Sequence, residues 1–236
     1  MSKTIQRLYV GIGICLLGFA NIGLSGCGVI KLAGAMAQNY EYQKLIEVHP
    51  EYSGLENHTV AVLVDADYSI LFEHPRLMEV VADHISARLA KEVEGIRVLN
   101  PQMVRTWQYQ TPQWNAMPLS EVADDLGVNR LVHIDLYEFR LNPPGNQWLW
   151  EGVAAATIGL AERESYDSDQ YAETFNVVAE FPDVRGVTRD GASQNAVETG
   201  LLSRFVKEST WLFYTHTEPK YPDKYKPDTT SQGQSK

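Results

Sequence analysis

Cysteine and basic residues are both scarce in this chain of 236 residues. It has two cysteines, Cys15 and Cys27, which are too few for a disulfide scaffold or for a zinc site made of cysteines. Lysine and arginine number 20 against 30 aspartates and glutamates, which gives a formal net charge of −10. Because a protein of that sign repels phosphate backbones, we expect no nucleic-acid partner.

Sequence patterns of catalytic sites are also missing. The chain has neither a Gly-x-Ser-x-Gly elbow nor a glycine-rich phosphate-binding loop. A zinc site needs three or four convergent ligands, but the histidines form no His-Glu-x-x-His or His-x-His pair. They are His49, His58, His74, His84, His133 and His216. We therefore expect a protein that is not an enzyme and that carries no cofactor.

Only one long apolar run is present, from Leu8 to Ile22. It is too short for a comfortable transmembrane helix, which needs about 20 apolar residues. The basic residues Lys3 and Arg7 precede it, and small residues follow it. This order is typical of a secretory signal peptide, which we predict over residues 1–26.

The apolar run closes with Leu24-Ser25-Gly26-Cys27, which resembles the lipobox of bacterial lipoproteins. The resemblance implies that a diacylglycerol is attached to the Cys27 thiol and that cleavage leaves this residue as the new N-terminus. A third acyl chain, such as palmitate, is then usually added. Two or more acyl chains hold a protein firmly on a bilayer, whereas one chain binds reversibly. The alternative is a chance cysteine in an uncleaved helix or an ordinary secretory signal.

Gly28 follows the cysteine of the predicted lipobox. In proteobacterial lipoproteins an aspartate at this position is the signal for retention in the inner membrane. Its absence implies a cell-envelope protein delivered to the outer membrane and facing the periplasm. Membrane lipid, bound through the acylated Cys27, is the first expected partner.

The chain after the signal divides into three predicted parts. Residues 27–57 have no clean period and should form the lipid anchor and a tether with some local structure. Residues 58–216 contain strand and helix patterns and should form one α/β domain. Residues 217–236 are rich in proline and polar residues, so we expect a disordered tail.

Hydrophobic periodicity marks the elements of the domain. Thr59–Val64 is β-branched and apolar on both faces, as in a central strand. An apolar residue recurs every four positions from Leu77 to Leu89, which predicts a helix that stops at Gly95. The other expected elements are strands at 96–99, 130–141, 150–163 and 171–181, a turn or short helix at 101–110, and helices at 121–126 and 194–214.

The order β-α-β-α-β-β-β-α predicts an α/β fold with a single mixed sheet and helices packed on its faces. Two crossovers of the parallel type would be followed by an antiparallel meander. Alternation along the strand 130–141 should place Val132 and Leu136 on one face and His133 and Phe139 on the other.

Three segments carry a second, looser resemblance: Thr59-Val-Ala-Val-Leu-Val64, Val98-Leu-Asn-Pro101 and Leu119-Ser-Glu-Val-Ala-Asp-Asp-Leu-Gly-Val-Asn-Arg-Leu-Val-His-Ile134. They are similar to the fold shared by the TolB amino-terminal domain, the curli secretion-channel lipoprotein and the lipoprotein activators of penicillin-binding proteins. Over residues 57–216 the resemblance implies an envelope lipoprotein that works by contact with other proteins. It carries over no catalytic residue.

Aromatic residues gather in two predicted loops. Trp107, Tyr109 and Trp114 lie in a segment rich in glutamine and proline, and Trp148 and Trp150 follow a Pro-Pro-Gly turn. Tryptophans in exposed loops are typical anchors of interfaces, so these five residues are candidates for binding a partner. The alternative is that they fold back as lids over the core.

Asp65 and Asp67 follow the strand Thr59–Val64, at the edge where open α/β sheets often bind ligands. Two carboxylates could share a divalent cation, but no further ligand pattern accompanies them, which favours turn residues. Five of residues 153–159 are small (Val153, Ala154, Ala155, Ala156 and Gly159), so something should pack closely against them. A pocket near Asp65 and this strand is a second place where a ligand could bind.

The sequence thus favours a lipid-anchored, non-enzymatic accessory or assembly factor of the cell envelope. Its partner would be a protein complex for transport, secretion or wall synthesis. The alternative is a ligand-binding envelope lipoprotein with its pocket near Asp65 and strand 153–159.

Overall fold

The structure is a computed structural model that divides the chain into two compact units. The described residues are 41–167, 169–222 and 224. The units are Met1–Val48 with Thr217–Lys236, and His49–His216. The predicted signal peptide and Cys27 lie outside the described residues. In the ranges that are described, no helix combines the length and the apolar character needed to cross a membrane.

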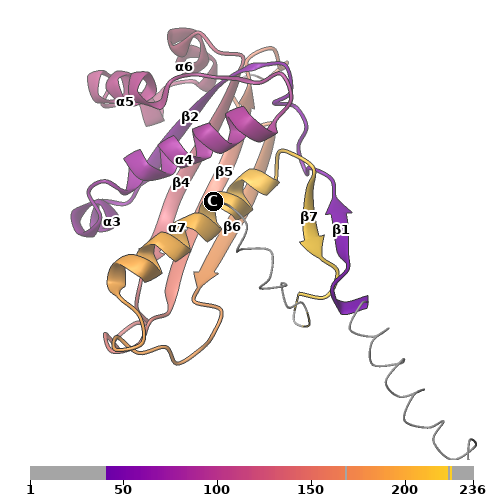
Figure 1. Cartoon of the computed structure of the whole chain (residues 1–236). Coiled ribbons are helices and arrows are strands. Elements are labelled where there is room, and N and C mark those ends of the chain that lie inside the picture. The colour runs from indigo at the N-terminus through magenta and orange to yellow at the C-terminus, as the bar shows by residue number, and fades with distance from the viewer. Residues whose placement is uncertain (1–40, 168, 223, 225–236) are drawn as a thin grey trace, which may run out of the picture. The chain divides into compact units, whose positions relative to one another are not determined.

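The larger unit is built on one five-stranded mixed sheet (Figure 1). Its strands are β2 (Thr59–Ala66), β3 (Arg97–Val98), β4 (Arg130–Arg140), β5 (Gly152–Glu162) and β6 (Glu173–Phe181). They lie in the order β3-β2-β4-β5-β6. β2 is parallel to β3 and β4, and β4, β5 and β6 form an antiparallel meander. The predicted α/β fold with a mixed sheet is confirmed.

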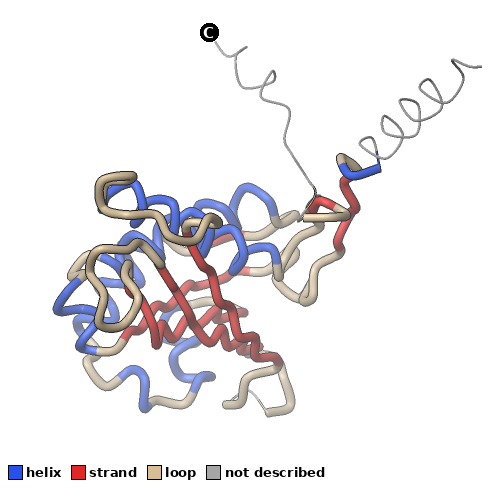
Figure 2. The backbone as a smooth tube through the Cα atoms, turned by 90° about the horizontal axis from the view of Figure 1, so that it is seen from below, coloured by secondary structure: helices blue, strands red, loops and turns tan. Residues whose placement is uncertain are grey.

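Two long helices, α4 (Leu77–Glu92) and α7 (Gln194–Trp211), cover one face of this sheet (Figures 1 and 2). The four-residue spacing of apolar side chains on α4 places Ile85 and Leu89 in the core, where both are buried. Phe205 of α7 is fully buried on the same face. Burial of each such side chain stabilises the fold by roughly 1.5–3 kcal/mol, so this layer supplies most of the apolar stabilisation.

The opposite face carries shorter elements near the start of β4. They are α5 (Pro101–Gln110), the 3-10 turn η1 (Trp114–Ala116) and α6 (Leu119–Leu126). The Asn100 side chain accepts a hydrogen bond from Gln102 N and caps α5, and Gly127 ends α6 in the left-handed conformation at φ 67°. Val104 and Val122 bury against Leu63 of β2 in a second apolar cluster.

A β-bulge in β4 corrects one prediction. The pairing register between β4 and β5 shifts between Leu136 and Glu138. A bulge inserts one residue, so the side-chain alternation slips and Phe139 turns to the face that holds Val132. Phe139 is buried in the main core. The expectation that it shares a face with His133 was wrong because the periodicity of the sequence does not reveal the extra residue.

The domain also begins earlier than predicted. Leu55 is buried in the main core, and the backbone N–H of Tyr52 donates to Leu212 O at 3.0 Å. Residues 49–57, which we placed in the tether, therefore belong to the larger unit.

Arg130 fastens this early segment to the sheet. Its buried guanidinium donates to Gly54 O at 3.0 Å and pairs with Glu164. Tyr52 donates to Glu162 Oε1 at 2.5 Å. Burial and the Glu162 carboxylate raise the pKa of the Tyr52 hydroxyl, and the hydrogen bond from Arg130 lowers the pKa of Glu164. Charge-assisted hydrogen bonds of this kind are stronger than neutral ones, so this network holds residues 52–54 against the sheet.

A second, two-stranded sheet consists of β1 (Leu45–Val48) and β7 (His216–Pro219), whose arrows run in opposite directions in Figure 1. Except for His216, both strands belong to the smaller unit. The backbone N–H of Lys220 donates to Lys44 O at 2.8 Å. We expected disorder from residue 217 onward, and this was wrong for the residues of β7. Its composition is polar, but pairing with β1 satisfies its backbone groups.

Candidate functional site

Several of the predicted site residues meet where β2 ends. A hollow of about 340 Å³ lies there between α4 and α5, with Trp114 of η1 also in its lining. Its other polar and aromatic lining residues are Asp65, Glu79, Gln102, Arg105, Gln108 and Tyr109. Gln108 Nε2 donates to Val64 O at 3.3 Å, which ties α5 to the end of β2. Asp65 and two of the candidate aromatic residues, distant in sequence, therefore share one cavity.

The first group of candidate aromatic residues, Trp107, Tyr109 and Trp114, has mixed environments. Trp107 and Trp114 are partly buried and pack on the second apolar cluster. Tyr109 is 80% exposed. The tryptophans thus have the lid position that we kept as the alternative, and Tyr109 offers its ring to the solvent.

His133 lies beneath the Trp114 lid. The two rings meet edge to face, with centroids 5.2 Å apart. His133 Nδ1 and the Tyr171 hydroxyl hydrogen-bond at 2.6 Å, and Nε2 is buried with no hydrogen-bond partner among the described residues. Burial lowers the pKa of His133, against the opposing effect of the carboxylates of Asp65 and Asp135. The neutral ring is therefore the favoured form at this position.

Gly159 makes room for Tyr171. It pairs with His133 across β4 and β5, and a Cβ atom added to it would lie 2.6 Å from the Tyr171 ring. The prediction that something packs closely on the small residues of 153–159 is confirmed at this position. No residue of 153–159 is among the described residues that line the hollow near Asp65. The hollow is formed by α4 and α5 instead.

The aspartate pair makes a poor metal site. Asp65 Oδ1 accepts a hydrogen bond from Ala66 N at 2.9 Å, and Asp67 is an exposed residue that precedes a helix. Within the described ranges, no group of three histidine, cysteine, aspartate or glutamate residues is arranged to hold a metal ion. Two carboxylates alone fall short of the six or more oxygen ligands that calcium takes.

The helix after Asp67 carries two aromatic residues that sequence analysis missed. This helix, α3 (Tyr68–Glu73), buries Ile70 but leaves Tyr68 92% and Phe72 90% exposed. Residues four apart on a helix lie on the same side, so the two rings form one apolar projection. The sequence signal was present as an apolar stretch between Asp67 and Pro75, too short to show a period.

The second aromatic pair separates into one exposed and one buried residue. Trp148 is 77% exposed. Trp150 is 4% exposed, its Nε1 donates to Ala192 O at 2.8 Å, and the Arg189 guanidinium lies 5.1 Å from its ring centre. Trp150 is therefore a core residue, and the prediction that it binds a partner was wrong. The turn before it gave no hint of this, because the residues that cover Trp150 lie about 40 positions later in the chain.

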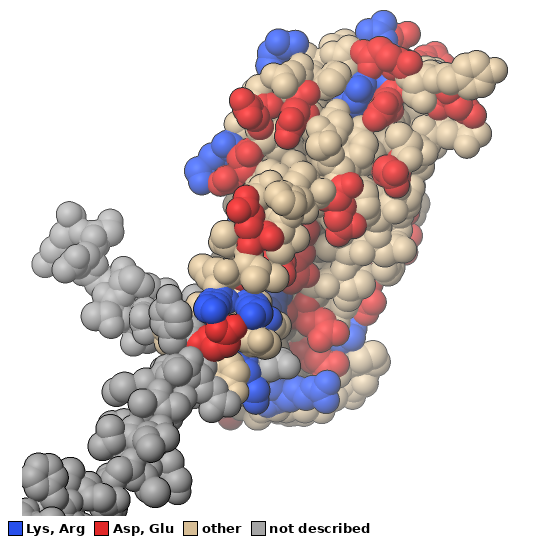
Figure 3. Space-filling model, turned by 90° about the vertical axis from the view of Figure 1, so that its right-hand side faces the viewer, with Lys and Arg blue, Asp and Glu red and all other residues tan. Residues whose placement is uncertain are grey.

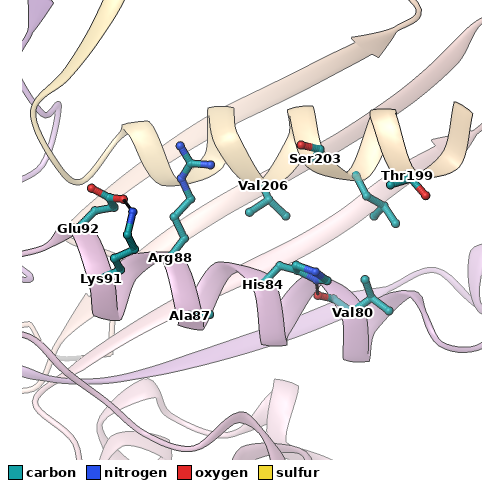
Figure 4. Close-up of a pocket in the computed structure, with 10 residues that line it drawn as sticks. Val80, His84, Ala87, Arg88, Lys91, Glu92, Thr199, Ser203 and Val206 are labelled. Atoms are coloured by element: carbon teal, nitrogen blue, oxygen red, sulfur yellow. Dashed lines mark hydrogen bonds and ion pairs between the residues drawn. The ribbon is translucent and has the colours of Figure 1, made fainter. Parts of the chain in front are cut away.

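A further hollow of about 670 Å³ separates α4 from α7 (Figure 4). Two of its polar side chains bond within the chain: His84 Nδ1 and Val80 O are 2.7 Å apart, and Arg88 Nε donates to Tyr214 Oη at 2.8 Å. None of the residues singled out from the sequence as site candidates lines it.

Acidic side chains are scattered over the face that Figure 3 shows. Exposed carboxylates of the larger unit include Glu151, Glu173, Glu180 and Asp183. Such a surface attracts basic partners and repels polyanions.

No protein-family model matches the sequence, and no curated protein matches it. Among solved structures, the chain is similar to the PelC dodecamer from Paraburkholderia phytofirmans, with 11% identity and a TM-score of 0.42. The alignment covers 72% of this chain and 97% of that chain.

Two further structures show a likeness of the same order. Lipoprotein GNA1162 from Neisseria meningitidis has 12% identity and a TM-score of 0.40, with 64% of this chain and 96% of that chain covered. The hypothetical protein CT253 from Chlamydia trachomatis has 14% identity and a TM-score of 0.40, with 64% and 95% covered. At these identities and scores the likeness assigns no role to this chain.

Proposed function

We propose that this chain is a lipid-anchored protein of the cell envelope that works without catalysis, as an accessory or assembly factor that contacts another protein. The observation that carries the contact role is the pair of almost fully exposed rings on α3, Tyr68 and Phe72. Large apolar side chains are rarely left in water side by side without a partner, and aromatic residues are the commonest interface anchors.

The proposed contact surface comprises Tyr68, Phe72 and Tyr109, and we call it the aromatic surface. Tyr68 and Phe72 lie on α3, which follows β2 in the chain, and Tyr109 lines the hollow at the end of β2. Transfer of one such ring from water into a protein pocket is worth roughly 1.5–3 kcal/mol, or about tenfold in affinity for each 1.4 kcal/mol. Exposed Asp67 and Glu73 flank the α3 rings, so the partner pocket should have a basic rim.

The proposal of a lipid anchor is based on the lipobox that ends at Cys27. Acylation there would hold the acidic domain at a bilayer surface without a spanning helix. We place the protein in the outer membrane, facing the periplasm, on the ground that no aspartate follows Cys27. Mass spectrometry of the purified protein should find a chain that starts at an acylated Cys27. An intact Met1 and a free thiol would contradict the anchor.

Substitution of both α3 rings tests the contact role. Tyr68→Ala/Phe72→Ala should abolish recovery of a stoichiometric partner cross-linked in native membranes, while the free energy of unfolding stays unchanged. The control is Tyr166→Ala, which removes another fully exposed ring in the loop between β5 and β6. Equal recovery with the double variant and the control would exclude α3 as the contact site.

A ligand-binding role is the second candidate, favoured by the convergence of Asp65, Tyr109 and Trp114 on one hollow. Aromatic faces beside a carboxylate and amide side chains suit a small polar ligand with an apolar face. Soluble wall fragments should then raise the melting temperature of the protein, and Asp65→Asn should reduce the rise. If no fragment shifts the melting temperature, the ligand-binding role is excluded and the contact role is the remaining candidate.

A further inference from the structure

Tyrosines and lysines are paired around Glu41, the first residue that the structure describes. Tyr42 and Tyr221 meet edge to face, with ring centroids 5.9 Å apart at 85°. Lys220 Nζ lies 5.2 Å from the centre of the Tyr221 ring. With Glu41 and Lys44, these residues form what we call the tyrosine–lysine pole.

The pole is a positive group in an acidic chain. One carboxylate, Glu41, is shared by two ammonium groups: Lys44 Nζ lies 2.5 Å from Oε2 and Lys220 Nζ 2.7 Å from Oε1. Hydrogen bonds from the two lysines lower the pKa of Glu41 to about 2, and Glu41 raises the pKa of Lys220. Two lysines against one glutamate give the trio a formal charge of one positive.

Apolar side chains beside the pole are exposed. Leu45 and Ile46 of β1 are 52% and 43% exposed. Neighbours on a strand point to opposite faces, so the two-stranded sheet shows an apolar side chain on each face.

We propose that the tyrosine–lysine pole rests on the lipid headgroups of the membrane that holds the acyl chains. Tyrosine has an apolar ring with a polar tip, and lysine has an apolar stem with a charged head. These residue types are enriched where protein meets the headgroup layer, and lysine is drawn to anionic lipid. Leu45 or Ile46 would dip toward the acyl boundary beside them.

The short distance along the chain between Cys27 and the pole favours lipid headgroups over a protein as the partner of the pole. Roughly 14 residues separate Cys27 from Glu41, and such a segment spans at most about 50 Å. The pole is thus the described part that follows the acyl anchor most closely along the chain. The inference rests on the proposed acylation of Cys27, and the experiment below separates the two.

A fluorescent label at the pole reports contact with lipid directly. The full-length gene with Gln43→Cys would be expressed, and the acylated protein reconstituted in vesicles of phosphatidylethanolamine and phosphatidylglycerol. Acylation blocks the Cys27 thiol and removal of the signal discards Cys15, so the new cysteine is the single site for an environment-sensitive dye. Lys224→Cys gives a second label close to the pole, and Tyr166→Cys places the control label on the larger unit.

The expected result is a several-fold rise in emission at Gln43→Cys and Lys224→Cys on reconstitution, quenched by spin-labelled lipid, with no change at Tyr166→Cys. Tyr42→Ala/Tyr221→Ala in the Gln43→Cys background should reduce the rise, and vesicles of neutral phosphatidylcholine should show the part that does not depend on charge. Protein that floats with vesicles while both pole labels stay in water would overturn the inference and leave the anchor standing. Protein that does not float, and takes the dye at Cys27, would overturn both.

Discussion

Trp114 packs edge to face against His133, with ring planes at 78° and centroids 5.2 Å apart. This contact ties the segment after α5 to the middle of β4. On its other side His133 bonds to Tyr171 from the loop that precedes β6. Three segments are therefore joined by one imidazole, and one of its contacts, Trp114, also lines the hollow beside Asp65.

Acid should weaken the fold through His133. Burial lowers its folded pKa below the ordinary value of 6.5, so the unfolded chain binds the proton first as the pH falls. The contribution of His133 is intact above the ordinary value and is lost as the pH falls from 6.5 toward the lower folded pKa. His133→Gln should show a free energy of unfolding that varies less over this window.

Urea denaturation at several pH values measures this effect. His84→Gln is the matched control, because it makes the same change at an exposed position on α4. A His133→Gln variant with the same slope as the parent would contradict the predicted role of the buried ring.

Gly159→Ala should displace Tyr171. The added Cβ would lie 2.6 Å from the ring, which must move and give up its bond to His133. We expect a loss of about 1–3 kcal/mol in the free energy of unfolding, as for other overpacked sites. Gly191→Ala is the control, because its nearest neighbour would be 3.4 Å away, and it should change stability by no more than about 0.5 kcal/mol. An unchanged His133 titration by NMR in Gly159→Ala would refute the displacement.

Arg130→Met should destabilise the domain at its N-terminal border. The substitution leaves Gly54 O without its donor, so we expect a loss of about 1–3 kcal/mol. Glu164 loses its charged partner but keeps the hydrogen bond from Asn129 Nδ2. Hydrogen exchange of residues 52–58 should accelerate more than that of the β4–β5 pairing. Arg163→Met is the control, because its pair with Asp124 is exposed and worth about 1 kcal/mol or less. Similar losses in both variants would show that burial of Arg130 adds nothing.

Local periodicity was sufficient to predict the sheet and its main helices. The four-residue spacing on α4 and the β-branched run in β2 report the face that each element buries, and this information is local. The order of the elements then restricts the topology, because parallel strands require crossovers and short turns give antiparallel neighbours.

The features that were missed depend on contacts between distant segments. The bulge that turns Phe139 inward exists only through pairing with β5, and β7 is a strand only because β1 pairs with it. The candidate site shows the same division. Asp65 was found from its place after a strand, whereas the exposure of Phe72 depends on how its short helix packs, which composition does not encode.

The two tryptophans after the Pro-Pro-Gly turn should respond to substitution in opposite ways. Trp150→Phe removes the donor to Ala192 O from a buried site and should cost about 1–2 kcal/mol, beyond any loss of contact with Arg189. Trp148→Phe changes an exposed ring and should stay within about 0.5 kcal/mol of the parent. Thermal and urea unfolding of the two variants side by side measure the difference. Equal stabilities would mean that Trp150 is not held in the core, and its candidacy as a contact residue would then be restored.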